Sequence, residues 1–106
     1  MIESLENVRV EVRDGRHFIA MDIDGEYAEI HYEQRLLRWG GVNVGPWFVI
    51  EEKHRFVIPA DPGEGRPSPE VAYGVVNDSR VTSLARYLIE GVNNRTIKPG
   101  PLKGVI

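Results

Sequence analysis

The sequence predicts an α+β fold in which an antiparallel β-meander, extended to a five- or six-stranded sheet, packs against one C-terminal amphipathic helix. Three observations support this class. Two Asp-Gly pairs, Asp14-Gly15 and Asp24-Gly25, each lie between runs of alternating apolar and polar residues, which is typical of tight β-hairpins. A second strand-rich block follows at residues 46–59. An apolar stripe with helical spacing then begins after the candidate caps at residues 77–79.

The two Asp-Gly turns set a strand register for residues 7–33. A type I′ turn needs positive φ at both central residues, which Asp and Gly tolerate. The first turn pairs Val10 with Ile19 and Val8 with Met21, and the second pairs Ile19 with Ile30, so both agree on one core face. That face holds Val8, Val10, Val12, Ile19, Met21, Ala28, Ile30 and Tyr32. The outer face holds Arg9, Glu11, Arg13, Arg16, Phe18, Ala20, Asp22, Tyr27, Glu29, His31 and Glu33.

The middle of the chain is less regular. Residues 34–45 contain a Gly-Gly pair, and we interpret them as a crossing or turn out of the third strand. The block at residues 46–59 leaves two alternatives. In the first, Glu52-Lys53 makes a two-residue turn and Trp47 faces Ile58. In the second, the block is one long bent strand, because Glu-Lys is a poor type I′ turn.

The second half of the chain supplies a loop, a strand, the helix and a tail. Residues 60–69 are rich in Pro and Gly and predict an exposed loop, and residues 70–76 predict a central strand that is buried on both faces. The helix is predicted to run to about Asn93, with an apolar stripe of Val81, Leu84, Ala85, Leu88, Ile89 and Val92. The tail at residues 95–106 is rich in Pro and Gly but ends in apolar residues, so it docks on its own domain or on a neighbour.

Composition restricts the class of protein. The chain has 106 residues, a net charge of −3 and no cysteine, and we expect a single α+β domain over residues 1–106. Without cysteine there is no disulfide, thiolate metal site or cysteine nucleophile. The acidic balance disfavours nucleic acid, because phosphate contacts need an excess of Lys and Arg. No apolar run reaches the roughly 18 residues of a membrane span, and we expect a cytoplasmic protein without membrane contact.

No catalytic, cofactor-binding or metal-binding residue is predicted. The register places His17 on the core face and His31 on the outer face, and the sequence has no His-x-His or His-x-x-x-His spacing for zinc. The turn at residues 63–66 is flanked by prolines, which remove the backbone donors that a phosphate would need. No serine lies in a Gly-x-Ser-x-Gly elbow. These observations favour a protein that is not an enzyme.

The outer face of the meander is the strongest candidate for a binding site. Phe18 and Tyr27 lie there among charged residues, and exposed aromatic rings of this kind indicate an interface unless neighbouring Arg side chains cover them. The candidate protein interface consists of Arg9, Arg13, Phe18, Tyr27 and His31. Single-stranded nucleic acid could stack on the same rings, but the interleaved carboxylates would repel phosphate, so protein is favoured over nucleic acid.

The predicted function is therefore a small non-enzymatic module for protein interaction or assembly, of the inhibitor, immunity or adaptor type. Its partner is another protein or a second copy of itself, which would make a homodimer. The first alternative is a nucleic-acid-associated protein that uses the outer face. The second is a small-ligand binder or enzyme with a cleft near Trp39, Trp47 and His54.

Overall fold

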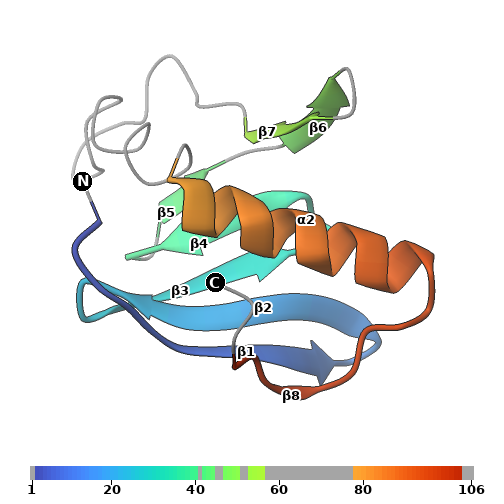
Figure 1. Cartoon of the computed structure of the whole chain (residues 1–106), viewed down its shortest axis with the longest axis horizontal. Coiled ribbons are helices and arrows are strands. Elements are labelled where there is room, and N and C mark those ends of the chain that lie inside the picture. Colours follow the sequence, from blue (N-terminus) through green and yellow to red (C-terminus); the bar gives the residue numbers. More distant parts are fainter. Residues whose placement is uncertain (1, 41, 45–46, 51–52, 57–77, 104–106) are drawn as a thin grey trace.

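The protein is an α+β structure built on an antiparallel sheet (Figure 1), and the computed structural model describes residues 2–40, 42–44, 47–50, 53–56 and 78–103. The main sheet has six strands in the order β5-β4-β3-β2-β1-β8. Their bounds are β1 Leu5–Arg13, β2 Arg16–Ile23, β3 Glu26–His31, β4 Leu36–Trp39, β5 Val42–Val44 and β8 Gly100–Pro101. A separate two-stranded sheet pairs β6, Trp47–Ile50, with β7, Lys53–Phe56. The helix α2, Ser79–Asn93, lies across one face of the main sheet (Figure 1).

The register predicted for the meander is confirmed through its centre. Both central residues of each Asp-Gly turn have positive φ, with values of 52° and 74° in the first turn and 49° and 83° in the second. Val10 pairs with Ile19, and Ile19 pairs with Ile30. The predicted pair of Val8 with Met21 falls in a β-bulge. Asn7, with a φ of 55°, and Val8 both lie between the paired residues Glu6 and Arg9, whereas Met21 alone lies between their partners on β2. A bulge of this kind adds a residue to one strand.

The core lies between the inner face of the sheet and the helix. The buried residues are Ile2, Val8, Val10, Ile19, Met21, Ile23, Ala28, Ile30, Leu37, Val81, Leu84, Ala85, Leu88 and Ile89. The predicted helical stripe therefore forms the core side of α2, because residues spaced by three and four lie on one face of a helix. Val12 departs from the prediction. It lies two residues before the first turn and is 40% exposed.

Residues 34–45 contain two strands, so their interpretation as a crossing or turn out of the third strand is wrong. β4 pairs antiparallel with β3, and β5 pairs with β4, which continues the meander. Leu37 lies opposite Ile30 and is fully buried, and Trp39 lies opposite Ala28 and packs against the core. These two apolar side chains extend the core face, which is the physical reason that this segment joins the sheet.

The block at residues 46–59 contains a hairpin, but it does not extend the main sheet. Trp47 pairs with Phe56 rather than with Ile58, so the register is shifted by two residues from the prediction. The hairpin forms a separate sheet, and β7 lies against α2. The loop predicted at residues 60–69 and the strand predicted at residues 70–76 lie outside the described residues.

The helix is not the last element, so its description as C-terminal needs correction. Beyond α2, Arg95 takes the left-handed conformation, with a φ of 57°. The chain then forms β8, in which Gly100 pairs with Val10 on the edge of the sheet. The backbone N–H of Leu102 also donates to the carbonyl oxygen of Val8 at 2.9 Å. The tail thus pairs with part of the edge of β1, whose backbone hydrogen-bonding groups would otherwise be free to pair with another chain.

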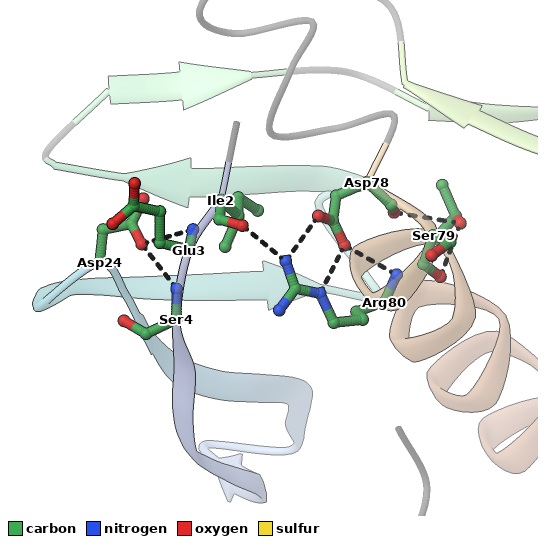
Figure 2. A network of polar contacts seen from close by, with 8 residues as sticks. Ile2, Glu3, Ser4, Asp24, Asp78, Ser79 and Arg80 are labelled. Carbon is green, nitrogen blue, oxygen red and sulfur yellow. Dashed lines mark hydrogen bonds and ion pairs between the residues drawn. The ribbon is translucent and has the colours of Figure 1, made fainter.

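The start of the chain is held by two carboxylates (Figure 2). Asp24 Oδ1 accepts hydrogen bonds from the backbone N–H groups of Glu3 and Ser4, at 2.9 and 2.8 Å. Asp78 is the N-cap of α2 and accepts from the backbone N–H of Arg80 at 2.8 Å. The guanidinium of Arg80 donates to Asp78 Oδ2 and to the carbonyl oxygen of Ile2, at 2.8 and 2.9 Å. The hydrogen bonds from Arg80 hold the pKa of Asp78 below its ordinary value.

We expect Asp78→Ala to lower the free energy of unfolding by about 1 kcal/mol, the usual cost of losing an N-cap oxygen. The substitution also removes the carboxylate that orients Arg80 toward Ile2. Urea denaturation followed by circular dichroism measures the change. Ser83→Ala, on an exposed position of the same helix, is the matched control. Equal midpoints for Asp78→Ala and the wild-type protein would contradict the role of this cap.

Candidate functional site

The candidate site is the outer face of the main sheet, which is the face opposite α2 (Figure 1). Side chains alternate along each strand, so the residues between the core positions point to this face. The register places Glu11, Phe18, His31 and Leu36 in one row across four strands. The neighbouring row contains Arg9, Ala20, Glu29, Arg38 and Asn43.

Phe18 is covered by its neighbours on the outer face. Its side chain is only 2% exposed, so of the two alternatives for this ring the one in which neighbouring side chains cover it holds. The guanidinium carbon of Arg13 lies 3.9 Å from the ring centroid, and the His31 ring stacks on it at 5.3 Å with an interplanar angle of 21°. Phe18 therefore supports Arg13 and His31 by cation–π and stacking contacts rather than meeting solvent itself.

Glu29 is the centre of the polar network on this face. It is 6% exposed, and a buried carboxylate needs hydrogen-bond donors to offset its lost hydration. Arg13 Nη2 and the Tyr27 hydroxyl donate to Oε1 at 2.5 and 2.6 Å, and His31 Nε2 lies 2.6 Å from Oε2. Because Tyr27 and His31 are each two residues from Glu29 on β3, their side chains share its face. Both oxygens of the carboxylate are thus occupied from within the chain.

The network holds its groups in defined charge states. Burial raises the pKa of Glu29, but the hydrogen bonds from Tyr27, Arg13 and His31 outweigh it and hold that pKa below the ordinary value. Burial and the hydrogen bond to Glu29 raise the pKa of Tyr27 to about 12. The hydrogen bond to Glu29 also raises the pKa of Arg13. At neutral pH, Glu29 is a carboxylate and Tyr27 a neutral phenol, so neither has the pKa near 7 that suits proton transfer.

Two adjoining depressions lie on this face and open to solvent. The first has a volume of about 320 Å³ and is lined by Arg13, Asp14, Arg16, Phe18, Glu29, His31, Gln34 and Arg38. The second has a volume of about 500 Å³ and is lined by Glu26, Tyr27, Glu29, Arg38 and Gly40. Glu29 and Arg38 line both, so the two depressions form one continuous surface, which we call the outer-face site.

The structure brings all five predicted interface residues into this surface or to its border. Arg13, Tyr27 and His31 meet at Glu29, and Phe18 lies beneath Arg13 and His31. The predicted residue at the border is Arg9, whose guanidinium carbon lies 5.9 Å from the Tyr27 ring centroid. Tyr27 is 46% exposed.

Two residues of the outer-face site were missed by sequence reasoning. Glu29 was counted only as a charge that repels phosphate, although the predicted register already placed it between Tyr27 and His31 on one face. Arg38 was missed because residues 34–45 were not expected to form a strand. Its pairing opposite Glu29 depends on β4, for which the sequence has no Asp-Gly turn to set the register.

The other candidate positions do not join the outer-face site. Trp39 packs on the core side of the sheet, and the side chains of Trp47 and His54 lie outside the described part, so the predicted cleft stays a prediction. His17 lies beside Tyr32, and its Nδ1 is 2.6 Å from Glu33 Oε1. Within the described ranges, no group of three or more His, Cys, Asp or Glu side chains is placed to hold a metal ion.

The fold and the site define a small α+β protein with a polar, aromatic-bearing surface on the outer face of its sheet. No family model, curated protein or solved structure matches the chain. Among the described helical residues, no helix has the length and hydrophobicity to cross a membrane.

Proposed function

We propose that the protein is a non-enzymatic interaction module that binds another protein through the outer-face site. The observation that carries this proposal is a buried and fully paired Glu29 that lines both depressions, with the exposed Tyr27 in the second and three arginines, Arg13, Arg16 and Arg38, in the first. Tyr and Arg, with Trp, are enriched among the residues that contribute most of the binding energy in protein interfaces. In the part of the chain that the structure describes, α2 packs on the opposite face of the sheet.

The network supports this function because it restrains the contact residues before binding. The Tyr27 hydroxyl and the Arg13 guanidinium are both anchored on Glu29, and Arg13 also stacks on Phe18. A side chain that is already held in one rotamer loses less conformational entropy when a partner binds. The outer-face site therefore has the preorganisation that an interface needs.

The burial of Phe18 weakens the alternative of nucleic-acid binding. Among the described outer-face residues, Tyr27 is then the one exposed aromatic ring, whereas single strands are held by several stacked bases. A second copy of this chain is the alternative protein partner. The tail no longer argues for it, because β8 and Leu102 already pair with β1 of the same chain. We further propose a cytoplasmic location, which the absence of cysteine fits.

A photo-crosslinking amino acid at position 27 tests this function in the cells that produce the protein. We expect a discrete crosslinked protein from position 27 and none from position 87, a matched exposed tyrosine on the helix. With the purified partner, Arg38→Glu should weaken the affinity by about tenfold or more, as expected for an interface anchor. Arg86→Glu, an exposed arginine of α2, is the matched control. Light scattering of the purified protein gives its molar mass in solution and so shows whether the partner is a second copy.

The proposal is contradicted if position 87 gives the same crosslinked proteins as position 27. It is equally contradicted if Arg38→Glu leaves the affinity for the purified partner unchanged, which is the result expected of the control Arg86→Glu. Circular dichroism of each variant shows that the fold is retained. Tight binding of a single-stranded oligonucleotide that is lost in Arg38→Glu would favour the nucleic-acid alternative instead.

A further inference from the structure

We propose that the first depression of the outer-face site binds a carboxylate from an acidic segment of the partner protein. This inference rests on the proposed function and specifies the chemistry of the partner. It is carried by the charges that line the depression, by the pairing of Glu29 and by the strand register that brings the arginines together.

The lining of the depression is basic, although the chain is acidic. Three arginines face two carboxylates, Asp14 and Glu29, which leaves a net charge of +1 with His31 neutral, against −3 for the whole chain. A concave surface whose charge is opposite to that of the rest of the protein attracts a partner segment of negative charge.

Glu29 does not neutralise Arg16 or Arg38. Its oxygens are occupied by Arg13, Tyr27 and His31. Among the described residues, neither Arg16 nor Arg38 forms an ion pair or a side-chain hydrogen bond, and both are exposed. Within the part of the chain that the structure describes, these two guanidinium groups are therefore available to a ligand.

The register places like charges together at the depression. Arg13 lies directly opposite Arg16 at the end of the first hairpin, and two like charges at paired positions are destabilising. Arg38 approaches from β4, where it pairs with Glu29. An anion between these arginines would relieve the repulsion.

A carboxylate fits this depression better than a phosphate does. A guanidinium group binds either anion with two parallel hydrogen bonds. Asp14 and Glu29 also line the depression, and they repel a doubly charged phosphate more strongly than a singly charged carboxylate. Gln34 adds an amide that can bond to the peptide backbone beside the carboxylate. An acidic peptide segment is the ligand that these groups match together.

Nuclear magnetic resonance with the ¹⁵N-labelled full chain tests this inference, with acetylated and amidated tetraglutamate as the probe. We expect saturable shifts of backbone amides within residues 13–18 and 31–38, which weaken as salt screens the charges. Arg16→Gln and Arg38→Gln should each raise the dissociation constant by about fivefold to tenfold, because each substitution removes one charge-assisted contact. Arg86→Gln should leave it unchanged. Tetraglutamine is the matched neutral probe.

Several results would overturn the inference. The first is the absence of saturable shifts with tetraglutamate. The second is that tetraglutamine causes the same shifts as tetraglutamate. The third is that the Arg38→Gln variant binds tetraglutamate as tightly as the wild-type protein does. Inorganic phosphate or an oligothymidylate that binds the same residues more tightly than tetraglutamate would assign the depression to phosphate instead. If tetraglutamate fails while partner binding still depends on Tyr27 and Arg38, this inference is wrong and the proposed function stands. If partner binding is independent of both residues, the proposed function is wrong.

Discussion

Ile19→Ala should lower the free energy of unfolding by about 2–5 kcal/mol, the usual cost of truncating a large buried aliphatic residue to alanine. Ile19 is fully buried, and it lies on the central strand between Val10 of β1 and Ile30 of β3. Its strand also packs against α2. Removing three methyl or methylene carbons there leaves a cavity that neither the sheet nor the helix can close. Urea denaturation at 25 °C measures the loss.

Two further variants make this result specific. Ile19→Val keeps most of the side chain and should cost about 0.5–1.5 kcal/mol. Tyr87→Ala, at a 37% exposed position of the helix, should change stability little. An Ile19→Ala protein that unfolds at the same urea concentration as the wild type would show that the register of the meander is wrong.

Glu29→Ala should be the most damaging change at a charged residue of the outer face, with a loss of about 1–3 kcal/mol at pH 7, the range for leaving buried partners unsatisfied. The substitution removes the acceptor of the Tyr27 hydroxyl and of His31 Nε2. Arg13 loses its ion pair as well, but its side chain is 57% exposed, so water replaces much of that interaction. Thermal unfolding and urea denaturation measure the loss.

The same variant should show a defined dependence on pH. The pKa of Glu29 is lowered in the folded state from its ordinary value of 4.5, so the folded state favours the charged form. Its contribution is therefore complete above the unfolded-state pKa and is lost as the pH falls through the lower folded-state pKa. The difference in stability between the wild type and Glu29→Ala should thus be largest at neutral pH and shrink below about pH 4.5.

A matched control separates this effect from general acid denaturation. Glu90→Ala removes an exposed carboxylate on the helix, and its difference from the wild type should be small at every pH. A difference between the wild type and Glu29→Ala that grows as the pH falls would contradict the assignment of Glu29 as a paired carboxylate. The ultraviolet absorbance of tyrosinate gives a second measure, because the pKa of Tyr27, about 12 in the wild type, should fall in Glu29→Ala.

The parts of the fold that were predicted correctly depend on local sequence. Each Asp-Gly pair forms its turn through its own backbone preferences, and the alternation beside it then decides which residues face the core. The N-cap at Asp78 and the apolar stripe of the helix are local in the same sense. Residues 34–45 have neither signal. Their strands form because Leu37 and Trp39 meet a core face that already exists.

In the candidate site too, the features that depend on local sequence were predicted, and those that depend on tertiary contacts were not. Alternation along β1, β2 and β3 was enough to place Arg9, Arg13, Phe18, Tyr27 and His31 on one face of the sheet. It could not show that Phe18 is buried there, because its cover consists of Arg13 and His31 from the two neighbouring strands. The role of Glu29 also needs three donors whose side chains converge on one carboxylate.

The sequence by itself determined the α+β class, the central register of the meander and the helix, because turn chemistry and periodicity act between residues a few positions apart. Tertiary structure alone decided that β4 and β5 extend the sheet, that the tail pairs with the edge of β1, and that Glu29 is the centre of the outer-face site. Each of these depends on partners distant in the chain. The free energy that selects them is gained only when those partners are already in place.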